Sequence, residues 1–266
     1  MRVKKRLIMA LSLLSVAITM GIIPACRASS FDADGGSGPK FVAHRGYSFE
    51  HCDNTEESFR AAAEMGFYGI ETDIRKTKDG YFVCNHDASV VYADGTERKI
   101  SKTDRDTLLD GSLKNEKTEE DARLCTFETY LQTCKEGNKV AVIELKDYVD
   151  QNDARKILKI VDDKYDRKKV TFISFSYLSL LAIKKTAPAI PLQYLSQTEN
   201  DPQFDSCLQD RISIDVKYTI LTEEIVRTFH EAGLTVNVWT VDDESTLRIA
   251  TELGVDYITT NVFCEE

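Results

Sequence analysis

The sequence predicts an α/β protein built as a single (β/α)8 barrel with a long excursion after its third strand. Short apolar runs alternate with helical patterns along the chain, and most connections between them are short. Several runs are apolar throughout, which is typical of parallel strands covered on both faces. Eight or nine such strands in 266 residues favour a closed barrel. A doubly wound open sheet is the alternative, but no Gly-x-Gly-x-x-Gly turn follows the first strand.

Nine segments have the composition of strands. They are residues 41–45, 69–74, 81–86, 139–145, 170–174, 190–195, 211–216, 235–241 and 256–260. Helical patterns follow most of them. The first expected helix has Asn54 as its cap, Glu57 three residues on and Gly66 at its end. The others are expected at residues 126–136, 152–164, 176–186, 222–232 and 243–253.

Two places break the regular alternation of strands and helices. Residues 75–80 join the second and third predicted strands and are too few for a helix. Residues 88–125 are polar and charged, and form a long excursion beside the third strand. Long loops on an α/β barrel usually shape the mouth of the active site, so we expect this excursion to border one.

The N-terminal residues have the pattern of an export signal. Residues 1–28 begin with basic residues, continue as an apolar run and end near small residues, as a secretory signal peptide does. The segment that ends at Cys26 also resembles a lipoprotein cleavage box, which would give a signal of residues 1–25 and a lipid anchor. An uncleaved membrane anchor is a third possibility. All three place the protein outside the cytoplasm of a bacterial cell, as a secreted protein or a membrane-anchored lipoprotein.

The rest of the chain divides simply. Residues 29–39 are small, polar and glycine-rich, which indicates a flexible linker. No repeat or second linker follows, so residues 40–266 are expected to form one domain.

The charge balance limits the partners. The chain carries 44 acidic and 34 basic residues, a net charge of −10. Such a surface repels nucleic acid and anionic membranes at long range. We therefore expect no nucleic-acid partner, and membrane contact only through a possible N-terminal lipid anchor. A phosphate-bearing ligand would need a local positive cluster or a metal.

Polar side chains gather at the expected carboxyl ends of the strands. In chain order these residues are His44, Arg45, Glu71, Asp73, His86, Glu144, Lys146 and Trp239. The strands of a parallel barrel all end at one rim, where active sites are built. These side chains, scattered along the sequence, should therefore converge.

Three of these residues suggest a metal site. Glu71 and Asp73 are two residues apart and leave the same face of their strand. Together with Glu144 they would place three carboxylates at one rim, where they would repel each other without a cation between them. Oxygen ligands of this kind suit Mg²⁺ or Ca²⁺ better than zinc.

Each of these residues also has an ordinary explanation. A lone histidine at a strand end, such as His44, is commonly a hydrogen-bonded structural residue. Glu-x-Asp pairs are frequent, Lys146 could lie on the surface, and Trp239 would by default belong to the core. Taken together, however, these explanations require every residue to fall at a strand end by chance.

The sequence resembles the glycerophosphodiester phosphodiesterase family over nearly the whole expected domain. The family's motifs stand here, in the family's order, as His44-Arg45-Gly46, Cys52-Asp53-Asn54-Thr55, Glu71-Thr72-Asp73, Thr77-Lys78-Asp79-Gly80, His86-Asp87, Glu144-Leu145-Lys146 and Trp239-Thr240-Val241. Two places depart from the family pattern. Cys52-Asp53 replaces Pro-Glu, and Thr259-Thr260-Asn261 stands where the family usually shows Thr-Asp.

The resemblance implies a barrel of the phospholipase C-like phosphodiesterase type that hydrolyses small glycerophosphodiesters to glycerol 3-phosphate and an alcohol. By position it implies His44 and His86 as general acid and base, Arg45 and Lys146 as phosphate ligands, Trp239 as a pocket residue, and Glu71, Asp73 and Glu144 as ligands of a divalent metal. Two alternatives stay open. One is a related phosphodiesterase acting on lysophospholipids or phosphoinositides, and the other is a non-catalytic surface protein that binds phosphodiesters.

Overall fold

The computed structural model describes residues 27–28, 38–114 and 122–264. The predicted signal segment (1–28) and linker (29–39) therefore lie almost entirely outside the described residues and stay predictions. Within the described ranges, no helix is both long and apolar enough to cross a membrane.

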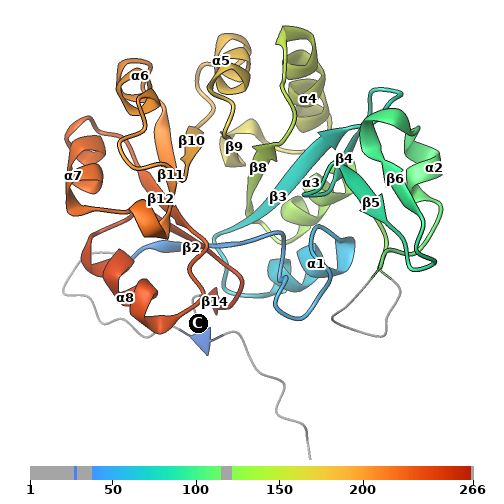
Figure 1. Ribbon diagram of the computed structural model, residues 1–266, viewed down its shortest axis with the longest axis horizontal. Coiled ribbons are helices and arrows are strands. Elements are labelled where there is room, and N and C mark those ends of the chain that lie inside the picture. Colours follow the sequence, from blue (N-terminus) through green and yellow to red (C-terminus); the bar gives the residue numbers. More distant parts are fainter. Residues whose placement is uncertain (1–26, 29–37, 115–121, 265–266) are drawn as a thin grey trace, which may run out of the picture.

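The core of the fold is a closed barrel of parallel strands with helices around it (Figure 1). Around the barrel the strands follow in the order β2 (Lys40–Ala43), β13 (Tyr257–Thr260), β12 (Val236–Trp239), β11 (Ser213–Lys217), β10 (Leu192–Ser196), β9 (Val170–Ser174), β8 (Val140–Leu145) and β3 (Gly69–Lys76). A further pairing of β2 with β3 closes the ring. This arrangement confirms the predicted (β/α)8 fold.

The third predicted strand does not belong to the barrel. Its residues form β4 (Phe82–Cys84), which pairs with β3 in the antiparallel direction, with Ile74 opposite Cys84. The expectation of a parallel strand at 81–86 was therefore wrong. The link between β3 and β4 is long enough for a hairpin turn but too short for the helical crossover that a parallel neighbour requires. Without this segment, eight of the nine predicted strands remain, and these eight make the barrel.

The helices agree closely with the sequence pattern. They are α1 (Glu56–Glu64), α3 (Phe127–Glu136), α4 (Gln151–Lys164), α5 (Tyr177–Thr186), α7 (Glu223–Glu231) and α8 (Glu244–Glu252). Helix α6 (Gln203–Gln209) was not predicted. Short 3-10 turns occur at η2 (Arg167–Lys169) and η3 (Tyr218–Ile220), and β1 (Arg27–Ala28) pairs with β14 (Phe263–Cys264).

The predicted cap of the first helix was wrong by one residue. Thr55, not Asn54, caps α1: its hydroxyl accepts a hydrogen bond from the Ser58 backbone N–H, and the Ser58 hydroxyl accepts one from the Thr55 N–H. This reciprocal pair satisfies two backbone donors at the helix start. Asn54 is left outside the helix in a left-handed conformation, with φ of 59°.

The excursion after β4 folds into a small unit beside the barrel, at the right of Figure 1. It contains β5 (Ser89–Val91), β6 (Glu97–Lys99), η1 (Ile100–Lys102), α2 (Arg105–Leu109) and β7 (Cys125–Thr126). It has its own buried cluster, made of Val83, Val90, Tyr92, Ile100, Leu108, Leu113, Ala122 and Leu124. The strand β7 pairs with β4, and this pairing ties the unit to the barrel.

Among the described residues, the barrel interior holds a small apolar cluster. Its buried members are Val42, Val142, Ile173 and Leu195, with Trp239 packed against it. On β8, Glu144 lies two residues beyond Val142 and therefore on the same inner face, nearer the carboxyl rim. The apolar cluster thus forms a floor, and the inner positions beyond it are free to carry polar side chains.

Candidate active site

A tight turn after β2 positions the first two site residues. Arg45 and Gly46 both have positive φ, at 57° and 81°. A Cβ atom at residue 46 would collide with Ser58, so only glycine fits there. The Ser58 hydroxyl donates to the Arg45 carbonyl (3.0 Å), which fixes the turn against helix α1. The turn directs the Arg45 backbone N–H at Glu71 Oε2, 2.8 Å away.

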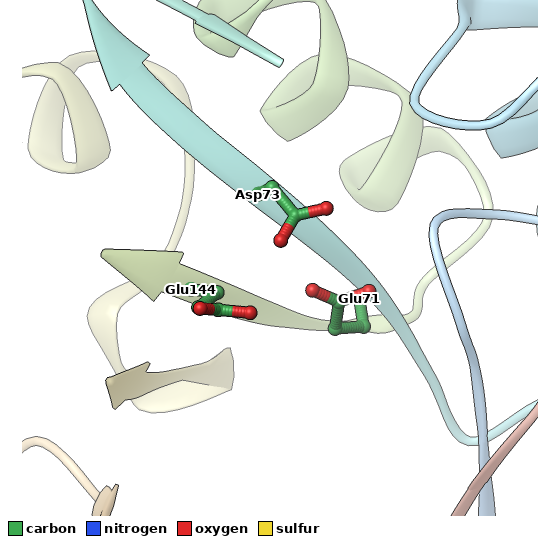
Figure 2. A group of neighbouring side chains, drawn as sticks. All are labelled: Glu71, Asp73 and Glu144. Carbon is green, nitrogen blue, oxygen red and sulfur yellow. The ribbon is translucent and has the colours of Figure 1, made fainter. Parts of the chain in front are cut away.

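Three acids meet at the carboxyl rim, as the sequence predicts. Asp73 on β3 is paired in register with Glu144 on β8, and Glu71 lies two residues before Asp73. One carboxylate oxygen from each lies within 4.8 Å of the others, and all three residues are buried. Figure 2 shows the three carboxylates turned toward one another between the two strands. A compact set of carboxylate oxygens is a donor set that fits a hard divalent cation.

Burial and mutual repulsion shift the pKa values of the three acids. Burial, and then the charges of Asp73 and Glu144, raise the pKa of Glu71 well above its usual range. Burial and the charge of Asp73 raise the pKa of Glu144 to about 7. Burial also acts to raise the pKa of Asp73, but Arg45, Lys146 and a hydrogen bond from Asn54 lower it overall. The cluster therefore holds more negative charge than the protein itself offsets.

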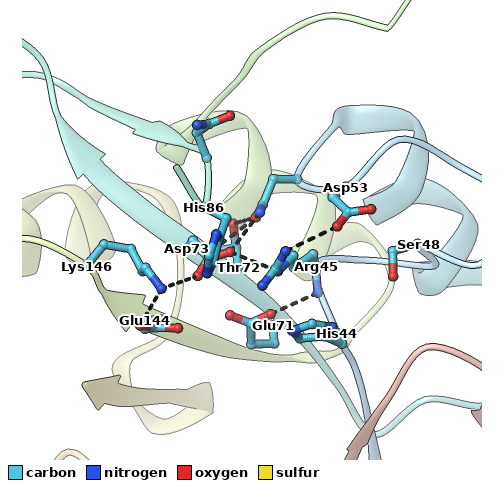
Figure 3. A network of polar contacts seen from close by, with 12 residues as sticks. His44, Arg45, Ser48, Asp53, Glu71, Thr72, Asp73, His86, Glu144 and Lys146 are labelled. Carbon is cyan, nitrogen blue, oxygen red and sulfur yellow. Dashed lines mark hydrogen bonds and ion pairs between the residues drawn. The ribbon is translucent and has the colours of Figure 1, made fainter. Parts of the chain in front are cut away.

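Two cations reach the acids from either side (Figure 3). The Arg45 guanidinium lies 3.3 Å from Asp73 through Nε and 3.3 Å from Asp53 through Nη1. Lys146 Nζ lies 2.9 Å from Glu144 and 3.5 Å from Asp73. Asp53 stands where the family pattern has glutamate, and the shorter acid still reaches Arg45. A phosphate group above the acids would meet both cations.

Sequence reasoning missed the role of Asn54. Its amide nitrogen donates to Asp73 Oδ2 (2.8 Å), and its oxygen accepts from the Thr72 hydroxyl (2.8 Å) and from the Asp73 backbone N–H (3.1 Å). The residue is buried, and these contacts set the direction of the Asp73 carboxylate. A signal was present in the Asn-Thr motif, but the common use of asparagine as a helix cap concealed it.

The surroundings of His44 fix which ring nitrogen carries a proton. Its Nδ1 lies 3.0 Å from Asn261 Oδ1. The Asn261 amide nitrogen donates to Asp242 (2.6 Å), so the amide oxygen must face the histidine and the Ser48 hydroxyl. Nδ1 is then the donor, which leaves Nε2 as the proton acceptor of the ring. Burial and the charge of Arg45 lower the pKa of His44, which favours the neutral ring.

His86 reaches the same cavity from the hairpin rather than from a barrel strand. The Arg75 guanidinium donates to its carbonyl (2.9 and 2.6 Å) and pairs with Asp147 (2.7 Å), which anchors this part of the chain. The His86 Nδ1 lies 2.9 Å from the Asp87 carboxylate. A carboxylate can only accept there, so Nδ1 of His86 is also a donor.

All of the predicted site residues except Asp73 line one cavity of about 300 Å³. Its walls are His44, Arg45, Glu71, His86, Glu144, Lys146, Ile173, Phe175, Leu195, Gln197, Asp215, Trp239 and Thr259. Phe175 packs edge-on against Trp239, with ring centroids 5.8 Å apart. Phe175, Gln197 and Asp215 were not predicted as site residues. The cavity therefore has a charged half and a second half with apolar walls.

A second hollow adjoins this cavity. It measures about 450 Å³, shares Arg45 and His86 with the first, and is bordered by Val90, Val91 and Leu113 of the excursion. The excursion does lie beside the mouth of the site, as expected from its length.

Residues 44–263 match the Glycerophosphoryl diester phosphodiesterase family. The chain belongs to this family. It is accordingly a phosphoric diester hydrolase that acts on glycerophosphodiesters. A glycerophosphodiester phosphodiesterase of Caldanaerobacter subterraneus is 27% identical over 83% of this chain and 93% of the relative.

Solved structures of the glycerophosphodiester phosphodiesterase family share the same fold. The enzyme of Parabacteroides distasonis superposes with a TM-score of 0.73 at 27% identity, covering 85% of this chain and 94% of the other. A phosphodiesterase of Oleispira antarctica, solved with its product sn-glycerol-3-phosphate, gives a TM-score of 0.74 at 19% identity over 85% and 94%. At that identity the second likeness concerns the fold alone.

Replacing Asn54 with glycine should weaken both the fold and the acid cluster. Glycine keeps the positive φ but removes the acceptor for two buried donors, which should lower the free energy of unfolding by about 1–3 kcal/mol. It should also weaken Mg²⁺ or Ca²⁺ binding by about 10- to 100-fold, because Asp73 loses its orienting partner. Denaturant unfolding and calorimetric titration measure these effects. Asn138→Gly is the matched control, since Asn138 also has positive φ (56°) but accepts a hydrogen bond from Lys169 instead of contacting Asp73. Equal effects in the two variants would contradict the assignment.

The raised pKa values predict an inverted pH dependence of stability without metal. Glu144, with a folded pKa of about 7, binds more protons when folded than when unfolded. It therefore contributes stability at low pH that is lost as pH rises through about 7. The lowered pKa of Asp73 acts only at more acidic pH. In EDTA, the Tm should fall between about pH 5 and pH 8, and Glu144→Gln should flatten that decline. If the wild-type Tm instead rises between pH 5 and pH 8 as steeply as the Tm of Glu144→Gln, Glu144 does not have this effect on stability.

Proposed function

We propose that the protein hydrolyses glycerophosphodiesters to glycerol 3-phosphate and an alcohol at a divalent metal site, with His44 and His86 as the proton-transfer groups. Glu71, Asp73 and Glu144 would hold the ion, Mg²⁺ or Ca²⁺. The observation that carries this proposal is the meeting of a buried three-acid cluster, two cations and two histidines at one cavity.

The metal would supply Lewis-acid polarisation of a phosphate oxygen when bound. Arg45 and Lys146 flank the acids and would hold the remaining phosphate oxygens, where they can balance charge that develops during the reaction. Because both side chains are already fixed by ion pairs in the protein, they need little rearrangement when the substrate enters.

The two histidines differ in ways that support different roles. The neutral His44 ring, with Nδ1 bonded to Asn261, presents Nε2 as a base. It would take the proton of the nucleophile, which is water or the glycerol 2-hydroxyl, as that oxygen bonds to phosphorus. His86, whose Nδ1 contacts the Asp87 carboxylate, would donate a proton to the leaving alkoxide as its bond to phosphorus breaks.

The hollow beside the cavity favours a polar leaving group over an acyl chain. It is lined largely by polar residues, namely Arg45, Cys52, Asp53, Asn54, Asn85, His86, Asp87, Ser89, Val90, Val91, Leu113 and Lys114. This supports small glycerophosphodiesters rather than lysophospholipids or phosphoinositides as substrates. The intact set of histidines, acids and cations likewise supports an enzyme over a non-catalytic binding protein.

We propose an extracytoplasmic location on the strength of the N-terminal sequence pattern. Residues 1–28 would direct export, and Cys26 would carry the lipid if the lipoprotein box is used. Cell fractionation of the tagged protein tests this, and retention of the full-length chain in the cytoplasm would contradict it.

Replacing His44 or His86 with alanine should reduce kcat for glycerophosphocholine by about 10²- to 10⁴-fold. Release of glycerol 3-phosphate is measured after EDTA treatment and return of Mg²⁺ or Ca²⁺ separately, which also tests the metal requirement. His230→Ala is the control, because His230 also contacts a carboxylate (Asp256, 2.9 Å) but does not line the cavity. With a 4-nitrophenyl leaving group, which needs no proton, the loss should shrink for His86→Ala and persist for His44→Ala. The reverse pattern would exchange the two roles.

Replacing Asn261 with aspartate should move the pH profile upward. A carboxylate facing His44 Nδ1 raises the pKa of the ring. A base acts only when neutral, so the acidic limb of kcat/KM should shift to higher pH. In Asn261→Ala the His44 ring loses the acceptor for its Nδ1–H, so kcat should fall. The acidic limb should not move to higher pH in this variant, because the Asn261 hydrogen bond itself raises the pKa of His44. If the acidic limb of kcat/KM is unchanged in Asn261→Asp and that variant keeps its Tm, His44 is not the base.

A further inference from the structure

Asp215 is an unexplained acid inside the active-site cavity. It lies on β11, is 1% exposed and lines the cavity wall. Its Oδ1 is buried and has no hydrogen-bond partner among the described residues. A buried polar atom without a partner costs free energy, and native proteins keep few of them. Because Asp215 lines a cavity that admits a substrate, a group of the ligand can become the partner of its carboxyl group.

The position of Asp215 separates it from the phosphate. In the closed strand order, three strands lie between β11 and β3 in either direction, so Asp215 stands across the barrel from Glu71 and Asp73. The cations that can hold phosphate, Arg45 and Lys146, belong to the opposite side. A carboxyl group would repel phosphate, so it must meet another part of the substrate.

The cavity walls near Asp215 indicate which part of the substrate Asp215 meets. Ile173, Phe175, Leu195 and Trp239 supply apolar surface to the cavity, and the Trp239 indole N–H donates to the Asp215 carbonyl (3.2 Å). An apolar wall with one polar atom beside it fits a short carbon chain bearing a hydroxyl. The leaving group is expected on the His86 side, so the glycerol unit occupies the side of Asp215.

We propose that Asp215 is the specificity-determining residue for glycerol, its carboxyl group forming a hydrogen bond with a free hydroxyl of the glycerol unit. This inference rests on the proposed function. It restricts the substrates to deacylated glycerophosphodiesters, because an acyl group on that hydroxyl would remove the partner and leave Asp215 unpaired. Burial and the charge of Glu144 raise the pKa of Asp215, against a hydrogen bond from Asn237. A carboxyl group can form a hydrogen bond with a hydroxyl in either protonation state.

A binding experiment tests this without relying on turnover. Calorimetry with Mg²⁺ or Ca²⁺ present compares glycerol 3-phosphate with n-propyl phosphate, which has the same carbon skeleton and phosphate but no hydroxyl. In Asp215→Leu, the preference for glycerol 3-phosphate should fall by about 10- to 100-fold, the range expected for one hydrogen bond to a buried acid. Affinity for n-propyl phosphate should change by less than about threefold. Asp215→Asn, which can still donate and accept, should keep part of the preference.

The fold of each variant is checked by its Tm. Leucine has the same number and branching of side-chain heavy atoms as aspartate, and removing a buried acid with one unpaired oxygen should change the Tm little. Equal weakening of both ligands would show that Asp215 organises the site as a whole and would overturn the inference. An unchanged preference for glycerol 3-phosphate would overturn it as well.

Hydrolysis of glycerophosphocholine by the wild type separates this inference from the proposed function. If the wild type hydrolyses it but the preference does not depend on Asp215, only the inference fails. If the wild type does not hydrolyse it yet prefers glycerol 3-phosphate through Asp215, the proposed function fails and glycerol recognition stands.

Discussion

The mutual repulsion of three buried carboxylates is the constraint on which the rest of the site depends. The register of β3 and β8 places Asp73 beside Glu144, and the pleat of β3 adds Glu71 on the same face. Three charges in so small a volume require fixed donors and cations around them. The structure supplies backbone and side-chain hydrogen bonds and three ion pairs, and these still leave two of the acids with raised pKa values. A divalent ion bound between the acids would complete the balance.

One short segment does much of this positioning. The loop between β2 and α1 carries His44, places the Arg45 N–H on Glu71 and directs Asn54 at Asp73. It can do so because Arg45, Gly46 and Asn54 all adopt positive φ, which turns the chain sharply twice within a few residues. The proposed base, a proposed phosphate ligand and the orientation of two acids thus share one rigid support. A change in this loop should disturb all three together.

The sequence was sufficient for the barrel and for most of the rim because both follow from local patterns. Apolar runs predict buried parallel strands, and polar residues at strand ends predict a common rim. The hairpin at β4 was misjudged because an apolar run does not show its direction. Asn54 was assigned to a helix start because its local preference fits one. Asn261 lies 217 residues from His44, and Asp215 sits inside an ordinary strand pattern, so both become visible only when the barrel closes.

The cavity divides the chemistry between opposite sides of the barrel. The elements β2, β3 and β8, with the hairpin, bring the histidines, acids and cations, while β9 to β12 bring apolar walls and Asp215. The charged side is tightly interlocked by ion pairs, so substitutions there affect several groups at once. Asp215 has one oxygen outside every hydrogen bond of the described protein. Substitutions on the β11 side should therefore change the selectivity for the glycerol unit while the proposed phosphate chemistry stays intact.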